Sequence, residues 1–318
     1  MCLDITEYPV FNNYHADREY LAAIKADNMD VVFLNIPDME VSIPLFKRLL
    51  ESDLFDLFSP LGFQPYIDRA LWPDLLIIMK DGLKEMGTVS LYILSRNDLS
   101  TISAPHGFDL SHYRTNYYID LQLSHDEWLG QLKKDSRQRL RKAIKTTRYK
   151  VELTTVSDEF VMNYHRIAKA RMFPKRYLLS WSDFVRFSNV NNLVYLELRE
   201  SRNNDFIAGG FFGCHNDDVD YLFGADNRQY RDAIRLLINE ARGYFRMHNF
   251  KRLYLGGGVK EGDSLARFKQ RMGTREQRCS AVRAVIDIEQ AERLYGNRFS
   301  NEWFKGFFPP YVKAGGDE

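Results

Sequence analysis

The sequence predicts an α+β protein whose helices and strands form two halves of one chain. Three observations favour this class. The first hundred residues alternate helix-like and strand-like hydrophobic patterns, as an α/β or α+β unit does. Around residue 200, three strand-like runs follow one another with asparagine-containing turns between them. Residues 219–273 then read as strand, long amphipathic helix, strand, glycine run and short helix.

The overall composition excludes several classes of protein. The chain has 318 residues, which is enough for one large or two ordinary domains with a substantial core. A hydrophobic content of 45% and a charged content of 27% are typical of a soluble globular protein. The formal net charge of +1 gives no global field that would attract nucleic acid or an anionic membrane, so any basic function must be local.

Cysteine usage and the N-terminus favour a cytoplasmic location. The three cysteines, at positions 2, 214 and 279, are odd in number and far apart, which excludes a disulfide framework. The first residues lack a basic segment followed by an apolar run, so no signal peptide is expected. The sequence contains no run of about 18 apolar residues, so no transmembrane segment is predicted. The seven histidines are scattered, so no metal site is expected.

The first half is expected to begin with a helix over residues 15–26 and a buried strand over residues 30–36. Residues 42–50 are amphipathic and are interpreted as a helix. A loop stiffened by Pro60 and Pro65 is predicted over residues 58–66. Two further strands are predicted over residues 75–79 and 88–94.

Residues 95–115 are polar and irregular, so the domain boundary is predicted there. The expected subdomains are residues 1–115 and 116–318. After a strand over residues 117–123, Ser124 and Glu127 form a capping-box pattern that opens one long helix through Ile144. Later helices are predicted over residues 157–171, 180–187, 234–245 and 289–304. Later strands are predicted over residues 193–198, 206–214, 219–223, 252–255 and 280–288.

The three glycines that follow the strand over residues 252–255 are the most informative local feature. Gly256, Gly257 and Gly258 let a ligand approach the backbone closely, because no Cβ blocks it. Asp263 or Ser264 caps the short helix that follows, and this helix carries Lys269. A lysine at this position could interact with a negatively charged ligand at the glycine run.

This region resembles the signature of the FemAB-like (peptidoglycan bridge peptidyltransferase-like) branch of the GNAT acyltransferase superfamily. The matching features are Tyr221 on a strand, the helix Ile234–Phe245, Leu255-Gly256-Gly257, the dipeptide Phe268-Lys269 and Gly273. Ser59-Pro-Leu-Gly-Phe-Gln-Pro-Tyr66 is similar to the family's Ser-Pro-Tyr-Gly loop, although Leu61 stands where an aromatic residue is usual. The resemblance covers most of residues 54–273. It implies two tandem GNAT-like subdomains with mixed sheets flanked by helices, the first a degenerate copy.

The resemblance implies an acyltransferase in which an amine attacks an activated carbonyl, so proximity and oxyanion stabilisation matter more than a covalent nucleophile. Lys269 is the first candidate, as a cation that supports the oxyanion or donor phosphate. The candidate catalytic residues are Lys269, Phe268 and Tyr221. The candidate substrate- and donor-binding residues are Arg137, Arg141, Tyr254, Gly256, Gly257, Arg228 and Asp226. For each there is a simpler structural alternative: a core aromatic, a buried tyrosine, a turn aspartate or a solvated helix face.

The donor is suggested by a departure from standard GNAT enzymes, which bind the CoA pyrophosphate on a glycine-containing loop at a helix N-terminus. The equivalent segment here is Arg228-Gln-Tyr-Arg-Asp-Ala233, with Arg231 in place of the glycine. Characterised FemAB-like proteins take the acyl group from aminoacyl-tRNA. This donor is therefore preferred over acyl-CoA, and no tightly bound cofactor is expected.

The expected acceptor is an amine of a cell-wall peptide, a sugar or a related metabolite, with the acceptor end of tRNA as a further partner and no DNA. The basic stripe of Lys134, Arg137, Arg141 and Lys145 favours a phosphate-binding helix face. One alternative is an acyl-CoA-dependent N-acyltransferase. Another is a non-catalytic protein that binds a nucleotide-sugar or peptide. A third alternative, a nucleic-acid-binding module, is supported by the basic helix alone. The active site is expected in a cleft between the two lobes.

Overall fold

The computed structural model describes residues 3–9, 17–25, 28–60, 65, 67–173, 177–305 and 308–309. The chain divides into two compact units. Unit 1 comprises Met1–Tyr113 with Arg278–Glu318, and unit 2 comprises Arg114–Gln277. The first boundary lies close to the expected one, but residues 278–318 belong to unit 1 and not to the C-terminal subdomain. The reason is that Ser280–Val285 pairs antiparallel with Ser90–Ser95.

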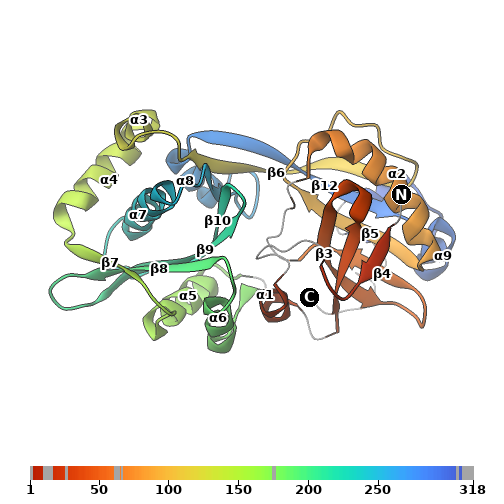
Figure 1. Ribbon diagram of the computed structural model, residues 1–318, viewed down its shortest axis with the longest axis horizontal. Coiled ribbons are helices and arrows are strands. Elements are labelled where there is room, and N and C mark those ends of the chain that lie inside the picture. Colours follow the sequence, from red (N-terminus) through yellow and green to blue (C-terminus); the bar gives the residue numbers. More distant parts are fainter. Residues whose placement is uncertain are drawn as a thin grey trace. The chain divides into compact units, whose positions relative to one another are not determined.

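Unit 1 is built on a mixed sheet. The order of its strands is β1 (Asp4–Thr6), β2 (Asp30–Ile36), β3 (Val41–Leu49), β4 (Phe55–Phe58), β5 (Thr88–Ser95) and β12 (Arg275–Val285). Only β4 and β5 run parallel; the other neighbours are antiparallel. The helices α1 (Arg18–Ile24), α2 (Trp72–Glu85) and α9 (Ile288–Tyr295) contact this sheet (Figure 1).

Two sequence-based predictions in unit 1 are wrong. Residues 42–50 lie in strand β3, because β3 pairs with β2 on one side and β4 on the other and places Val41, Ile43 and Leu45 in the core at alternate positions. Residues 75–79 lie in helix α2. Its buried residues recur at helical spacing, but this spacing is recognisable only when the whole length of the helix is considered and not residues 75–79 alone. They are Trp72, Leu75, Leu76, Met79 and Leu83.

Unit 2 is built on a second set of strands. Their order is β6 (Phe108–Asp120), β11 (Arg252–Gly256), β10 (Asp218–Asp226), β9 (Phe206–His215), β8 (Leu193–Glu200) and β7 (Tyr149–Leu153). The β10–β11 pair is parallel, whereas the β6–β11, β9–β10, β8–β9 and β7–β8 pairs are antiparallel. Strand β6 begins inside the stretch that was expected to be irregular. From residue 117 onward the predicted helices and strands occur in the predicted order, but β7 is additional, and the helix expected over residues 289–304 is α9, which ends at Tyr295.

Helices cover both faces of this sheet (Figure 1). The helices α4 (Lys134–Thr146) and α7 (Ala233–Met247) lie on one face, and α5 (Asp158–Ala170) and α6 (Trp181–Ser188) lie on the other. The long helix expected from Ser124 is in fact two, α3 (His125–Gln131) and α4. Leu132 interrupts it with an extended backbone, ψ 142°, while its side chain is 3% exposed in the core. Burial of this leucine therefore accompanies the break in the helix.

Candidate functional site

The candidate site is built where the parallel strands β10 and β11 stop pairing. The pairing joins Asp218–Asp220 to Arg252–Tyr254 and ends there, although β10 continues to Asp226 and β11 to Gly256. The residues predicted as functional begin at this point: Tyr221 follows the last pair on β10, and Gly256 and Gly257 follow it on β11. Unit 2 thus brings these predicted elements to the same region of its sheet.

A β-bulge between Tyr221 and Phe223 sets the direction of Tyr221. The Tyr221 ring lies 5.3 Å from that of Phe212, on the side of α7, whereas the Phe223 ring stacks 5.4 Å from that of Phe187 in α6. In a regular strand residues two apart face the same side, so the bulge is what separates them. A Cβ at Gly224 would lie 1.6 Å from the Tyr221 hydroxyl, so only glycine leaves room for this tyrosine.

Tyr221 and Asp226 share an electrostatic environment. Burial, together with the charge of Asp226, raises the pKa of Tyr221, while Arg171 opposes the rise. Tyr221 is therefore a neutral hydroxyl at physiological pH. Burial also raises the pKa of Asp226, against the opposing charges of Arg166, Arg171 and Arg228.

The sequence analysis missed two of the arginines whose charges act on Asp226, Arg166 and Arg171. Arg166 donates from Nη2 to the backbone oxygen of Asp226 at 2.6 Å and to Oδ1 of Asn163 at 3.1 Å. Its Nη1 is buried without a hydrogen-bond partner among the described residues. Arg171 follows the last turn of the same helix, α5. No local motif marks these residues, because only the packing of α5 against β10 brings them to Asp226.

The glycine loop after β11 is held by Asp263. Its carboxylate accepts hydrogen bonds from the backbone amides of Val259 at 2.8 Å, Lys260 at 3.0 Å and Ala266 at 2.7 Å. Asp263 is thereby the N-cap of α8 (Ser264–Met272), and the structure decides between the two predicted candidates, Asp263 and Ser264. A Cβ at Gly258 would lie 2.4 Å from Oδ1 of Asp263, so the glycine is needed for this close wrap.

Lys269 extends from α8 to the beginning of the glycine loop. Its Nζ lies 3.2 Å from the place a Cβ of Gly256 would occupy, and Gly256 has a φ of +75° that favours glycine. Burial, reinforced by the charge of Arg114 and opposed by that of Asp263, lowers the pKa of Lys269 to about 7. Arg114, also missed by the sequence analysis, packs its side-chain carbons against Gly257.

Phe268 is placed differently from its neighbour. Its ring lies 4.9 Å from the guanidinium of Arg235, which is 7% exposed. Nη1 of Arg235 pairs with Asp232 at 2.7 Å, and Asp232 also pairs with Nη2 of Arg139 at 2.7 Å. Phe268 therefore packs against an ion-paired group at the N-terminus of α7.

This ion-paired group lies in residues 228–233, the segment that the sequence resemblance compares with the pyrophosphate loop of GNAT enzymes. Asp232, the N-cap residue of α7, has a left-handed backbone and directs no side-chain cap bond to the helix. Its carboxylate is 6% exposed, whereas the side chain of Arg231 is 83% exposed. A buried carboxylate at a helix N-terminus occupies the environment that an anionic ligand would use.

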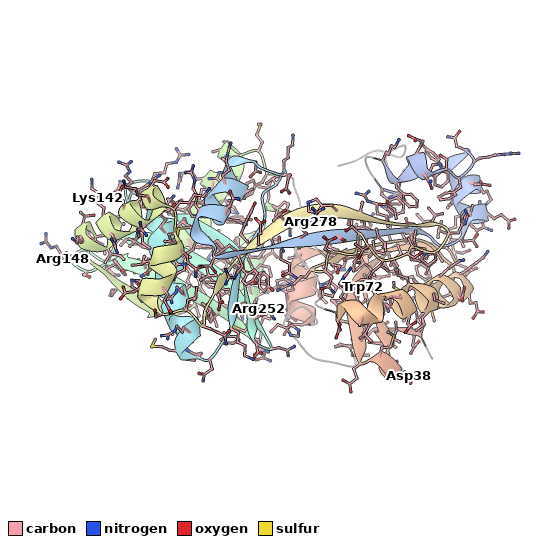
Figure 2. All side chains as sticks on the ribbon, turned by 90° about the horizontal axis from the view of Figure 1, so that it is seen from above. Asp38, Trp72, Lys142, Arg148, Arg252 and Arg278 are labelled. Atoms are coloured by element: carbon pink, nitrogen blue, oxygen red, sulfur yellow. The ribbon has the colours of Figure 1, made fainter. Side chains whose placement is uncertain are left out.

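The other predicted binding residues have structural roles or exposed positions. Tyr254 is buried and donates its hydroxyl to Oε1 of Gln277 at 3.0 Å. Arg137 donates to the carbonyls of Leu129 and Gly130 at the end of α3. Arg141 is exposed on α4. Figure 2 shows Lys142 and Arg148 projecting from the same end of unit 2.

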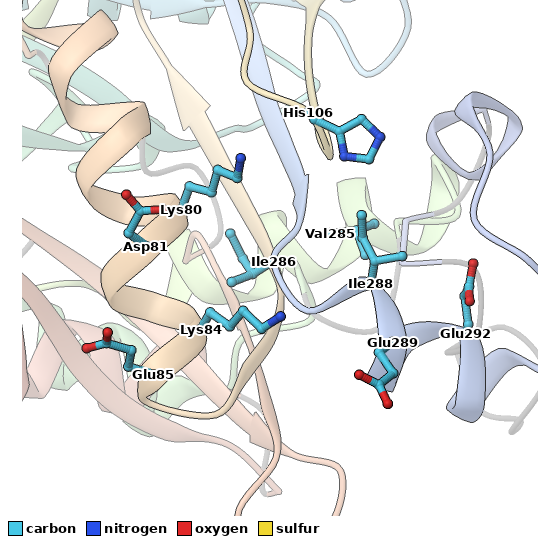
Figure 3. A pocket seen from close by; sticks show the side chains of 10 residues that line it. All are labelled: Lys80, Asp81, Lys84, Glu85, His106, Val285, Ile286, Ile288, Glu289 and Glu292. Carbon is cyan, nitrogen blue, oxygen red and sulfur yellow. The ribbon is translucent and has the colours of Figure 1, made fainter.

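A separate pocket of about 840 Å³ lies in unit 1, and none of the predicted site residues lines it. Lys80 and Lys84 of α2 reach toward Ile286, with Glu289 and Glu292 of α9 opposite (Figure 3). Most of these charged side chains are exposed, and no buried polar group converges there, so its chemistry is less specific than that around Lys269.

Two further observations concern the described residues only. They contain no group of three or more His, Cys, Asp or Glu side chains that could hold a metal ion. In the same ranges, no helix is both long and apolar enough to cross a bilayer. Most of the predicted loop over residues 58–66, including Leu61, lies outside the described residues.

Comparisons with known proteins give a likeness in structure and none in sequence. No family model and no curated protein matches the chain. The crystal structure of FemX superposes with a TM-score of 0.63 at 13% identity, covering 89% of this chain and 95% of FemX. The C-terminal domain of a putative lysylphosphatidylglycerol synthetase from Agrobacterium fabrum gives 0.56 at 12% identity, covering 86% and 88%. L-PGS from Bacillus licheniformis gives 0.53 at 10% identity, covering 86% and 93%.

These structures share elements across almost the whole chain, although few residues are identical. Likeness at this level of identity concerns the fold. The chain therefore has the α+β fold of FemX, with mixed strand pairing and flanking helices.

Proposed function

We propose that this protein is an acyltransferase that moves an acyl or aminoacyl group from an activated donor to an amine. The observation that carries this proposal is the environment of Lys269. A partly buried lysine with a lowered pKa lies over a glycine loop, where two parallel strands stop pairing. Such perturbed groups cluster at functional sites. The fold shared with FemX agrees with the FemAB-like resemblance of the sequence, which implies this reaction class.

In the proposed reaction, the neutral acceptor amine attacks the carbonyl carbon of the donor ester, forming a C–N bond and a tetrahedral oxyanion. The C–O bond to the donor then breaks, the released oxygen takes up a proton, and the nitrogen loses one. Lys269, in its protonated form, stabilises the oxyanion or the leaving oxygen. Tyr221, which stays neutral, donates a hydrogen bond to the substrate, and Asp226 anchors the acceptor amine.

Aminoacyl-tRNA is the donor we prefer. The buried, ion-paired carboxylate of Asp232 at the N-terminus of α7 disfavours a pyrophosphate there. Exposed basic residues of α4, including Arg141 and Lys142, supply a surface for an RNA backbone. The acceptor we propose is the amine of a cell-wall peptide, a sugar or a related metabolite.

A calorimetric titration with CoA and acetyl-CoA tests the donor, followed by transfer assays with charged tRNA and a panel of amine acceptors. We expect no CoA binding at micromolar concentrations and transfer of a radiolabelled aminoacyl group from tRNA. Micromolar CoA binding would instead identify the alternative, an acyl-CoA-dependent N-acyltransferase. Binding of a nucleotide-sugar without any transfer, unaffected by Lys269→Ala, would identify a non-catalytic binding protein.

A further inference from the structure

Strand β7 forms the outer edge of the unit 2 sheet, next to β8 (Figure 1). Within the part of the chain that the structure describes, no strand pairs with its other side. Such an edge offers backbone N–H and C=O groups to a further strand, and proteins often protect it with proline, a bulge or a covering segment. β7 contains no proline, and its register with β8 is unbroken from Tyr149 to Leu153. Val151 and Leu153 are 42% and 54% exposed.

One hydrogen bond establishes which backbone groups of β7 face the free edge. The N–H of Ser201 donates to the carbonyl of Arg148 at 3.1 Å, in register with the β7–β8 pairs. Along an antiparallel strand, residues whose backbone groups face the neighbour alternate with residues whose groups face away. Every second residue from Arg148 therefore directs its backbone groups to β8. The residues between them, Tyr149, Val151 and Leu153, direct theirs to the free edge.

The side chains of β7 also alternate, between the two faces of the sheet. The Tyr149 hydroxyl donates to Oε1 of Glu240 in α7 at 2.7 Å, which places the three apolar residues of β7 on the face covered by α7. Lys150 and Glu152 lie on the opposite face, where Nζ of Lys150 is 2.7 Å from Oε1 of Glu152. Along the strand the residues therefore read apolar, basic, apolar, acidic, apolar.

This order makes β7 complementary to itself. If a second copy of β7 pairs antiparallel with the first about a two-fold axis through Val151, each Tyr149 lies opposite a Leu153, and the two Val151 residues lie opposite each other. Each Lys150 then lies opposite a Glu152, so both charge pairs have opposite signs. The apolar pairs fall at hydrogen-bonding positions, so the outward backbone groups of all three apolar residues gain partners.

The neighbouring register lacks this complementarity. An axis through Tyr149 would also use the outward backbone groups, but it would place each Lys150 opposite an Arg148. Like charges directly opposite each other destabilise a strand pair. The charges of β7 therefore favour the register centred on Val151.

We propose that two copies of this chain associate through β7 into a symmetric dimer, in which the unit 2 sheet continues from one copy into the other. A two-fold axis uses the same surface of both copies, and β7 matches itself in backbone direction, charge and apolar contact. Pairing would also cover the exposed Val151 and Leu153. Because the strand has five residues, the contact is small and the dimer dissociates readily. This inference is independent of the proposed function.

Sedimentation equilibrium of the full-length protein tests the association. The mean mass at low concentration should be 37.4 kDa, the mass of one chain. We expect it to rise toward twice that value as the concentration increases from about 1 μM to about 1 mM, the range in which a weak complex forms. A mass that stays at one chain throughout this range would overturn the proposal.

Two charge-reversed variants, Lys150→Glu and Glu152→Lys, locate the contact. Each variant places like charges opposite each other in its own dimer and should weaken association about 10-fold. An equimolar mixture of the two restores opposite charges in the mixed dimer, so it should associate as the wild type does. The matched control is Lys80→Glu, on an exposed part of α2 in unit 1, which should leave association unchanged. A mixture that stays monomeric, while the wild type associates, would contradict the β7 pairing.

A third variant tests the backbone contact. Val151→Pro removes an N–H that faces the free edge and leaves the hydrogen bonds to β8 in place, as proline on an edge strand does. It should abolish association while circular dichroism shows an unchanged fold. Association that Val151→Pro and Lys80→Glu affect equally would assign the contact to another surface. If Val151→Pro does not fold, the charge-reversed pair still decides.

Discussion

Lys269 differs from an ordinary surface lysine in two ways: its amine is partly buried against a glycine turn, and its nearest charged neighbours include the cation of Arg114. If Lys269 stabilises charge in the transition state, Lys269→Ala should lower kcat on the order of 100-fold with little change in KM. Single-turnover transfer assays measure this. Lys84→Ala, an exposed lysine of unit 1, is the control; equal activity in both variants would remove Lys269 from the mechanism.

The lowered pKa of Lys269 also predicts a pH dependence of stability. Between about 7 and the ordinary lysine value of about 10.4, the unfolded chain binds the proton and the folded protein does not, so this group makes stability rise with pH. Below about 7 both states are protonated and the burial cost is fully present. Lys269→Met should therefore stabilise the protein at pH 6 by on the order of 1–2 kcal/mol more than at pH 9.5.

Urea unfolding of both proteins across this pH range measures the difference, because contributions of other groups cancel between them. A difference in stability that stays constant with pH would show that Lys269 titrates as an exposed lysine does.

Tyr221 and Gly224 form a close pair whose coupling can be measured. Gly224→Ala should destabilise the protein by about 1–3 kcal/mol, because its Cβ would overlap the Tyr221 hydroxyl. In a Tyr221→Ala background the same change should cost much less, because the overlapping ring is gone. A double-mutant cycle of unfolding free energies gives the coupling. Additive effects would mean that Tyr221 does not lie over Gly224.

At the scale of elements, the loop between β11 and α8 depends on one carboxylate. Asp263→Ala removes the acceptor of three backbone amides and should cost about 1 kcal/mol of stability while also lowering transfer activity, since Lys269 follows on the same helix. Asp287→Ala, which removes the N-cap of α9 in unit 1, is the matched control. It should lower stability similarly and leave activity unchanged. Loss of activity in both variants would show a general effect of lost stability.

Element type was predictable from sequence where a segment's own pattern agreed with its packing. The predictions of helix α5, strands β8 to β10 and helix α7 are confirmed, because amphipathic spacing and turn residues coincide there. Strand β3 and helix α2 were assigned to the wrong type. The apolar residues of β3 suit either period over a short window, and pairing with β2 and β4 decides between them. The break in the helix at Leu132, which is buried in the core, was not predicted.

At the scale of the whole molecule, residues 278–318 decide whether unit 1 is complete. Strand β12 pairs with β5 and contributes Val282 and Ala284 to the core of unit 1. A fragment of residues 1–115 should therefore fail to fold, whereas residues 1–113 joined to 278–318 by a flexible linker should fold. Near-ultraviolet circular dichroism and urea unfolding compare the two. Cooperative unfolding of the shorter fragment would contradict this division of the chain.

The sequence by itself determined the α+β class, the elements around the glycine loop, a helix cap at Asp263 or Ser264 and the candidacy of Lys269, because these depend on local spacing and on residues close together in the chain. Only the tertiary structure decided that Arg114 lies beside the glycine loop near Lys269, that Arg166 and Arg171 surround Asp226, and that Asp232 is ion-paired. Their neighbours are distant in the chain, and strand pairing and helix packing bring them together. Residues 278–318 likewise join unit 1 through contacts that are distant in the chain, because Ser280–Val285 pairs with Ser90–Ser95.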